Sequence, residues 1–242
     1  MSRTVLAATL LLFAPTLLSA QQDPKAAYDD LAKAFTKAIA QWQEEAQQAQ
    51  QAGKKIPAPP TKEFIGQAQE LATSFAGKDE AVRFLAFIVK SASNERNAVK
   101  KAVETLATDH AKSKAIGEAL PFLPNALRFG AQTQVMSLLD QVATGNADTD
   151  CQAQARITRG ALRLRSEDEA VRKQAEQDLR EVAKLTKNEE LLTQAKDALF
   201  EIEHLQVGCA APEIAGVDVE GVPFKLGDYR GKVVLLDFWG FW

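Results

Sequence analysis

The stretch that decides the C-terminal fold reads Gly231-Lys-Val-Val-Leu-Leu-Asp-Phe-Trp-Gly-Phe-Trp242. Residues 232–239 form a near-continuous apolar run, which is typical of a strand buried on both faces of a mostly parallel sheet. Asp237 is the only charged residue after Lys232. A carboxylate in a buried strand is costly unless it is paired. Asp237 is therefore either a functional buried group or an Asp at a strand end that faces water.

The residues before this run also point to β structure. From Val207 onward, glycine and apolar β formers replace the helical composition of the preceding chain. Residues 217–219 and 222–226, with a Glu220-Gly221 turn between them, predict a hairpin. Residues 227–231 predict a tight turn that leads into the apolar run. The order of these elements predicts the N-terminal part of an α/β domain.

Residues 24–205 are rich in Ala, Leu, Glu, Gln and Lys, which are strong helix formers. The first helix is predicted over 24–51, with an apolar stripe at helical spacing. The stripe consists of Leu31, Phe35, Ile39 and Trp42. The Pro-rich residues 53–60 predict an extended linker, because proline cannot donate a hydrogen bond and disfavours helix before it.

A series of shorter helices is predicted to follow this linker. Asp79 is predicted to cap a helix over 80–91, whose residues 84–89 are apolar all round and should be central; Asn94 is predicted to cap the next. Further helix starts are expected near Ser113, Asn125, Asp150, Ser166 and Lys187, with Asp168 competing for the cap at Ser166. The spacing favours helical hairpins, either stacked as an α-solenoid or packed as an irregular bundle.

Residues 1–20 are predicted to be a secretory signal peptide. Arg3 precedes the largely apolar residues 5–18, and Ser19-Ala20 offers a small-residue cleavage point. An uncleaved anchor is the alternative, although the run is shorter than the roughly 20 residues that span a bilayer. We therefore expect a periplasmic or secreted protein without a membrane span after cleavage. Export implies an oxidising compartment, where a Cys151–Cys209 bridge is possible but undetermined.

Composition excludes several functions. A net charge of −3 disfavours nucleic-acid binding, which needs a basic face. His110 and His204 lie far apart in sequence, and no Cys/His cluster has the spacing of metal ligands. No nucleotide-binding or serine-hydrolase motif occurs. We expect neither a metal nor a cofactor, and the oligomeric state is not predicted.

Three blocks of the C-terminal part resemble a known family. Residues 207–214 read V-G-C-A-A-P-E-I, residues 221–234 read G-V-P-F-K-L-G-D-Y-R-G-K-V-V, and residues 236–242 read L-D-F-W-G-F-W. In this order they are similar to the redoxin branch of the thioredoxin-like superfamily, which includes the alkyl hydroperoxide reductase/thiol-specific antioxidant family and exported thiol-disulfide oxidoreductases. In that family the next residue is the nucleophilic Cys of Cys-x-x-Cys. We therefore expect a chain truncated just before this motif.

The resemblance implies dithiol-disulfide exchange with protein disulfides, dithiols or a redox partner. Peroxide-reducing relatives usually carry a Pro- and Thr-rich segment directly before their Cys, and this chain lacks such a segment. Asp237 matches a buried residue that moves protons for the second thiol, Trp242 should flank the nucleophile, and Trp239 should contribute to the substrate surface. Phe238 is expected in the core. The nucleophile itself is absent from the sequence.

The two cysteines do not match the catalytic pair of the family. Cys209 lies in a loop-like segment, and Cys151 follows Asp148 and Asp150, which should raise its pKa and lower its reactivity. Both are interpreted as structural or variable positions.

The sequence thus predicts a signal peptide (1–20), an all-helical domain (21–205) and an incomplete thioredoxin-like domain (206–242). The favoured function is an exported thiol-disulfide oxidoreductase, present as a fragment that should be inactive as it stands. The alternative is a non-catalytic helical interaction module with a remnant redoxin tail. Alone, the C-terminal segment should be ordered only as a hairpin or as a strand resting on the helices, because its unpaired apolar strand would be an exposed edge.

Overall fold

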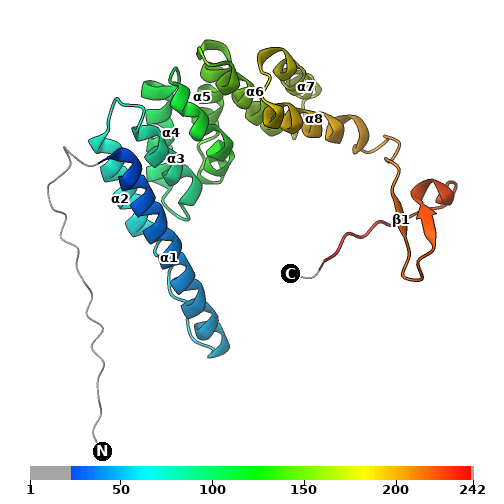
Figure 1. The fold of residues 1–242 in the computed structure, drawn as a ribbon, viewed down its shortest axis with the longest axis horizontal. Helices are drawn as coiled ribbons and strands as arrows, with labels where there is room; N and C mark the ends of the chain where they lie inside the picture. Colours follow the sequence, from blue (N-terminus) through cyan, green and yellow to red (C-terminus); the bar gives the residue numbers. More distant parts are fainter. Residues whose placement is uncertain (1–22, 241–242) are drawn as a thin grey trace, which may run out of the picture. The chain divides into compact units, whose positions relative to one another are not determined.

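The computed structural model describes residues 23–240 and is mostly helical, as predicted (Figure 1). The predicted signal peptide and Trp242 lie outside the described residues. The α-helices are α1 (Pro24–Gln51), α2 (Thr61–Ser74), α3 (Ala81–Ser91), α4 (Arg96–Thr105), α5 (Gln132–Gly145), α6 (Thr149–Arg163), α7 (Glu169–Leu185) and α8 (Glu189–His204). The remaining elements are the π-helical turn η1 (Leu106–His110), the 3-10 helices η2 (Lys114–Glu118), η3 (Leu120–Phe129) and η4 (Leu226–Tyr229), and the strands β1 (Ala215–Val217) and β2 (Pro223–Lys225).

The chain divides into two compact units, with the boundary between Gln152 and Ala153 inside α6. Each unit is described by itself below. Within residues 23–240, none of the helices combines the length and the apolar character that crossing a membrane requires.

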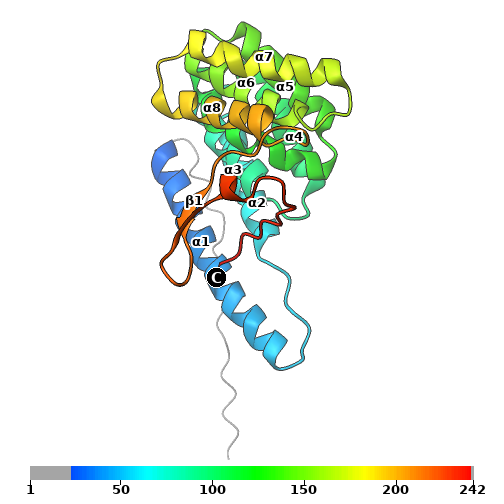
Figure 2. The same ribbon diagram turned by 90° about the vertical axis from the view of Figure 1, so that its right-hand side faces the viewer.

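The first unit begins with α1, whose bounds agree with the sequence prediction. The Asp23 carboxylate accepts hydrogen bonds from the N–H groups of Lys25 and Ala26, and Pro24 occupies the first helical position. The linker after α1 lacks regular structure and returns beside the helix to α2 (Figure 2). The Trp42 indole donates a 2.8 Å hydrogen bond to the Pro57 carbonyl, which ties this linker to α1.

Helix α3 is the centre of the first unit, which confirms the interpretation of its apolar middle. All residues from 84 to 89 are buried, and α3 packs against α2, α4 and the short helices η1, η2 and η3. Aromatic rings from three helices meet there: Phe35 lies 5.4 Å from Phe64 and 5.2 Å from Phe87 between ring centroids, both edge-to-face. Such pairs stabilise a core beyond the apolar area they bury. The first unit is thus a bundle around α3.

Two predicted helix caps were wrong. The Asp79 carboxylate does not cap α3 but accepts a 2.6 Å hydrogen bond from the Ser113 hydroxyl. The Asn94 side chain does not cap α4; instead the Glu95 carboxylate accepts hydrogen bonds from the N–H groups of Ser93 and Asn94. At α3 the expected capping side chain, Asp79, binds another residue instead. At α4 the neighbouring Glu95 side chain accepts the local N–H groups in place of Asn94.

The helix expected to start near Asn125 was also wrong, because Asn125 lies inside η3. Pro121 and Pro124 lack N–H donors, so the regular α-helical hydrogen-bond pattern cannot form across them. The next α-helix, α5, begins only at Gln132.

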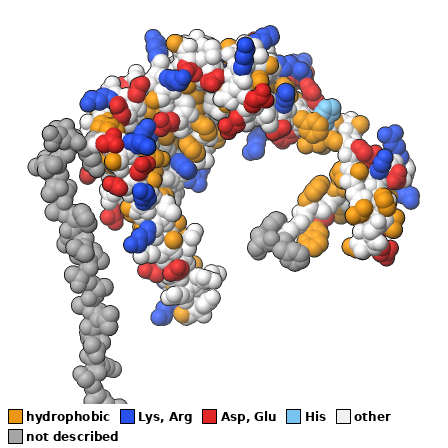
Figure 3. All heavy atoms as spheres, in the orientation of Figure 1, with side chains coloured by type: hydrophobic (Ala, Val, Ile, Leu, Met, Phe, Trp, Pro, Cys, Tyr) orange, Lys and Arg blue, Asp and Glu red, His pale blue; other side chains and the backbone are white. Residues whose placement is uncertain are grey.

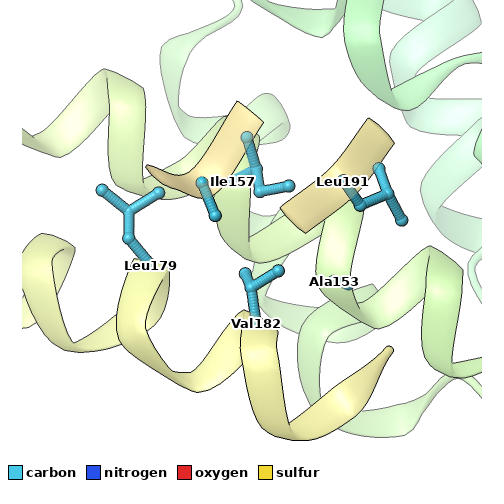
Figure 4. Close-up of a cluster of buried hydrophobic side chains, with 6 residues drawn as sticks. Ala153, Ile157, Leu179, Val182 and Leu191 are labelled. Carbon is cyan, nitrogen blue, oxygen red and sulfur yellow. The ribbon is translucent and has the colours of Figure 1, made fainter. Parts of the chain in front are cut away.

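In the second unit, α6, α7 and α8 enclose a cluster of buried apolar side chains (Figure 4). Ile157 comes from α6, Leu179 and Val182 come from α7, and Leu191 comes from α8. The Asp168 carboxylate caps α7 by accepting the Ala170 N–H at 2.8 Å. Asp168 was the predicted competitor of Ser166 for this cap. Within each helix the members of the cluster stand three or four residues apart, so each helix contributes one face to this core.

The segment after α8 contains the predicted hairpin with different bounds. Strands β1 and β2 pair antiparallel, with Gly216 opposite Phe224 and Val217 opposite Pro223. The connection runs over 218–222 instead of a two-residue turn. The Asp218 carboxylate accepts the N–H groups of Glu220 and Val222 at 2.9 Å each, and Gly221 supplies a positive φ of 82°. The Asp218 side chain thus holds this connection, which is longer than the predicted turn.

The buried strand that the apolar run 232–239 indicates does not form in this chain, in agreement with the expectation that its C-terminal segment is ordered only as a hairpin. Residues 233–240 have no regular structure and are exposed, including Val233 and Leu235 at 103% and 93% relative exposure. Figure 3 shows apolar side chains as orange spheres along this C-terminal segment. A strand buried on both faces needs hydrogen-bonded neighbours. Among the described residues, the only strands are β1 and β2, and they pair with each other.

Candidate functional site

The candidate site is the segment 206–240, which carries the residues of the redoxin-like blocks. Two hydrogen bonds join the residues that flank its hairpin. The Leu226 N–H donates to the Ile214 carbonyl at 2.8 Å, and the Gly227 N–H donates to the Glu213 carboxylate at 2.9 Å. Glu213 therefore links the first block to the second across the hairpin. Sequence reasoning missed this role; an acidic residue a few positions before the predicted hairpin was the available signal.

Gly227 leaves room for the Glu213 side chain in this contact. A Cβ atom at position 227 would lie 2.7 Å from Glu213 Oε2, so a larger residue would have to displace the carboxylate. The next acidic residue, Asp228, accepts the Lys225 N–H at 2.9 Å and thereby caps η4. The turn then ends at Gly231, whose φ is +83°. The Leu-Gly-Asp-Tyr-Arg-Gly pattern thus forms a turn that is held by its own Asp228 and by the contacts of Leu226 and Gly227 with residues 213–214.

The residues that were predicted to act in catalysis follow this turn. Asp237 is exposed in the irregular segment, and Trp239 is 73% exposed. Phe238, expected in the core, is also exposed, for the same reason that the strand is not formed. Trp242 lies outside the described residues. The proton-transfer role of Asp237 and the substrate-surface roles of Trp239 and Trp242 stay predictions.

Both cysteines carry free thiols in the structure. Cys151 is buried at the start of α6, where its thiol donates a 3.2 Å hydrogen bond to the Lys114 carbonyl. Burial, followed by the charge of Asp148, raises the pKa of Cys151 to about 11. This confirms the predicted direction and makes Cys151 a poor nucleophile at neutral pH. Cys209 is exposed.

The described part of the chain offers no preformed metal site: residues 23–240 contain no group of three or more His, Cys, Asp and Glu side chains arranged to hold an ion. The site is therefore a set of backbone turns, fixed by Glu213, Asp218 and Asp228, that leads into an exposed apolar segment.

Comparisons with known proteins find similarity over a short stretch. The chain is 53% identical over 36 residues to the thiol-disulfide oxidoreductase ResA of Geobacillus thermodenitrificans, which is 15% of this chain and 21% of that protein. It is 42% identical over 40 residues to the protein of that name from Bacillus thuringiensis subsp. konkukian, or 16% and 23% of the two chains.

The chain therefore spans about a fifth of the length of the curated relatives it matches. No protein-family model matches the chain, and no solved structure matches it. These partial similarities support, over about a sixth of the chain, a relationship to the thioredoxin-like thiol-disulfide oxidoreductases.

Proposed function

We propose that this chain belongs to an exported thiol-disulfide oxidoreductase, with residues 206–242 contributing to a thioredoxin-like module and the helices before it forming a separate body. The observation that carries this proposal is the 53% identity over 36 residues to a thiol-disulfide oxidoreductase. The ordered series of redoxin-like blocks in residues 207–242 supports the same conclusion. Export rests on the signal-like residues 1–20.

The proposed chemistry is exchange between a dithiol and a protein disulfide. A thiolate attacks one sulfur of the substrate disulfide, the sulfur–sulfur bond breaks, and the other substrate sulfur leaves as a thiolate. The second thiol of the pair then resolves the mixed disulfide, so the substrate gains two electrons and the enzyme becomes a disulfide. Asp237 would transfer the proton of the second thiol, while Trp239 and Trp242 would contact the substrate.

The exchanging pair is not among the 242 residues, because Cys151 and Cys209 are the only cysteines and form no Cys-x-x-Cys motif. Cys151 is buried with a raised pKa, which disfavours the attacking thiolate. The 242-residue chain therefore serves as a matched inactive control for any longer form of the protein.

The test isolates the native protein with an antibody against the helical body and maps its C-terminal peptides by mass spectrometry. The proposal expects a peptide that continues Gly240-Phe-Trp242 into a Cys-x-x-Cys, together with reduction of insulin disulfides that alkylation abolishes. Insulin reduction by the 242-residue chain itself should be absent. A native protein without a cysteine pair and without turnover would overturn the proposal.

A non-catalytic helical interaction module is the second candidate. One observation favours it: the packed structure lies in α1–α8, whereas residues 233–240 are exposed and irregular. This candidate predicts that a chain ending at His204 keeps all binding partners of the native protein. Loss of those partners on removal of 205–242 would contradict it.

A further inference from the structure

Four basic side chains lie around η3 in the first unit. Lys90 is in the last turn of α3, Arg96 and Lys100 are in the first half of α4, and Arg128 is in the last turn of η3. We call these four residues the basic cluster. Lys90, Arg96 and Arg128 are exposed and Lys100 is half-buried, so all four are accessible to a partner in solution.

Contacts with η3 and its neighbours fix the positions of these side chains. The Arg96 guanidinium donates a 3.1 Å hydrogen bond to the Phe129 carbonyl. Arg128 donates to the carbonyl of the residue that caps the C-terminus of α3, at 2.6 Å. Lys90 Nζ lies 5.0 Å from the centre of the Phe122 ring. Side chains held in this way lose less freedom when they bind a ligand.

The basic cluster has no carboxylate partner among the described residues, although the whole chain is acidic, with 32 Asp and Glu against 29 Lys and Arg. Elsewhere in this unit, Arg83 pairs with Glu118 and Lys114 pairs with Asp148. The neighbouring Glu95 carboxylate accepts two backbone N–H groups instead of pairing with the cluster. The positive charge of the cluster is therefore not compensated within residues 23–240.

Two of these charges lie where they lower the stability of α4. Arg96 is the first residue of α4, where a cation meets the positive end of the helix dipole. Lys100 follows four residues later on the same face of the helix, and like charges at this spacing repel each other. Local arrangements that are unfavourable for the fold are expected mainly at functional sites. Both placements are explained if an anion binds between the two side chains.

Gly130 leaves a small accessible space beside these two charges. It is exposed, and its φ of +73° is the left-handed conformation that ends η3. A Cβ atom at this position would lie 3.2 Å from Arg96 Nη1 and 3.9 Å from Lys100 Nζ. Both cationic groups therefore border one point above the Gly130 backbone. A carboxylate at this point faces both of them, and charge-assisted hydrogen bonds of this kind are strong.

The distribution of the charges indicates the class of partner. One small anion cannot contact cations on three elements, whereas successive carboxylates along a peptide can. The net charge of −3 disfavours a nucleic acid, which needs a larger basic face. We propose that the basic cluster binds an acidic segment of a partner protein, with one carboxylate above Gly130, between Arg96 and Lys100. The proposal is independent of the redox function, since it uses only residues of the first unit.

Titration of a hexaglutamate peptide into the full 242-residue chain, followed by amide NMR shifts, tests the proposal. The shifts should saturate and should centre on residues 90–100 and 127–131. Affinity should fall as the salt concentration rises to about 0.15 M, because exposed charges are screened at that ionic strength. Absence of binding to the folded chain at low salt, or shifts centred elsewhere, would overturn the proposal.

A charge-matched pair of variants tests the cluster itself. Lys90→Gln combined with Lys100→Gln should weaken peptide binding about three- to tenfold, since each exposed charge pair contributes modestly. Lys33→Gln combined with Lys37→Gln removes the same charge from exposed positions of α1 and should have little effect. Equal effects of the two double variants would show nonspecific attraction and would contradict the proposal.

Gly130→Asn tests the placement of the carboxylate. Asparagine tolerates the left-handed conformation, keeps the net charge and fills the space beside Arg96, so it should weaken binding. Gly77→Asn is the control, because Gly77 has the same φ of +73° and a Cβ atom there meets nothing within 4 Å. Circular dichroism verifies that both variants fold. Equal affinities of the two variants would refute this placement.

Two further measurements separate the peptide from other occupants of the basic cluster. Inorganic phosphate that binds as tightly as the peptide would show a site for a small ion. Salt-sensitive self-association that Lys90→Gln with Lys100→Gln abolishes would show a second copy of the chain as the occupant. Either result would overturn the proposal, which expects weaker phosphate binding and a monomer by analytical ultracentrifugation.

Discussion

Arg159 and Asp178 join α6 to α7 through a two-pronged ion pair. Arg159 Nε donates to Asp178 Oδ2 at 2.8 Å, and Arg159 Nη2 donates to Oδ1. Their side chains are 9% and 8% exposed. Arg156 and Arg163 also approach the Asp178 carboxylate, at 3.2 and 3.7 Å. One carboxylate on α7 therefore serves three arginines that share a face of α6.

Asp178→Asn should strongly destabilise the second unit. Removing one partner of a buried ion pair typically lowers the free energy of unfolding by about 3–5 kcal/mol, because a charge stays buried without compensation. Urea unfolding followed by circular dichroism measures this loss. Glu169→Gln is the control on the same helix, where the pair with Lys173 is exposed and should contribute little. Equal effects of the two changes would refute the role of burial.

Asn146→Ala should destabilise the first unit. The buried Asn146 amide donates to the carbonyls of Ala111 and Ser113 at 2.9 Å each. Each buried group left unpaired costs about 1–3 kcal/mol, so we expect a loss of roughly 3 kcal/mol in chemical unfolding. Asn146→Asp lacks the donors and should also be destabilising. Asn97→Ala, at an exposed position of α4, should stay within about 0.5 kcal/mol of the wild type.

Cys151 should resist alkylation in the folded protein, whereas the exposed Cys209 should react. The raised pKa of Cys151 leaves little thiolate at pH 8, and burial limits access. Iodoacetamide labelling with mass spectrometry should show fast modification of Cys209, with both cysteines reacting in urea. Asp148→Asn removes a charge that raises the Cys151 pKa and should lower it. Comparable native labelling of both cysteines contradicts the assignment.

The same thiol makes stability depend on pH in the alkaline range. Its pKa rises from an ordinary value of 9.0 to about 11 in the folded chain, so the unfolded chain loses the proton first. The contribution of the neutral thiol is complete below pH 9 and is lost between about pH 9 and 11. Cys151→Ala should remove this part of the pH dependence, measured as unfolding midpoints across that range.

Gly160→Ala should destabilise the packing of α6 against α7. A Cβ atom there would lie 3.1 Å from Leu179 Cγ and 3.3 Å from the Ala175 carbonyl oxygen, both in a tight interface. Overpacking typically costs about 1–3 kcal/mol, which exceeds the gain of up to about 1 kcal/mol in helix propensity. Gly66→Ala in α2 meets no atom within 4 Å and should raise the melting temperature. A stabilised Gly160→Ala variant would show that Leu179 adjusts freely.

Amides of residues 233–239 should exchange rapidly with solvent. These residues are irregular and exposed, whereas Val99 and Val103 of α4 are fully buried. Hydrogen-exchange mass spectrometry of the monomer should show complete exchange of the C-terminal peptide at times when α4 is still protected. Strong protection throughout 233–239 would mean that this segment is paired as a strand.

The sequence predicted a helix correctly where its capping and breaking residues agreed with its pattern of apolar residues. Asp23, Pro24 and the proline-rich linker determine the bounds of α1, and the all-round apolar residues 84–89 identify the central helix. The caps at Asp79 and Asn94 failed because their roles depend on Ser113 and Glu95, whose positions follow from tertiary or local competition.

The site was predicted less completely. The motifs located the hairpin and turn, but the burial of Asp237 and Phe238 depended on a strand whose neighbours are not among the described strands.

The hydrogen bond from Trp42 to the Pro57 carbonyl gives the protein an internal optical reporter. An indole held against a carbonyl emits differently from one in free water, and Trp239 is largely exposed. Emission from Trp42 therefore follows detachment of the proline-rich segment from α1, and Trp239→Phe would simplify that emission. The contact between the proline-rich segment and α1 can thus be followed by intrinsic fluorescence, without attaching a dye.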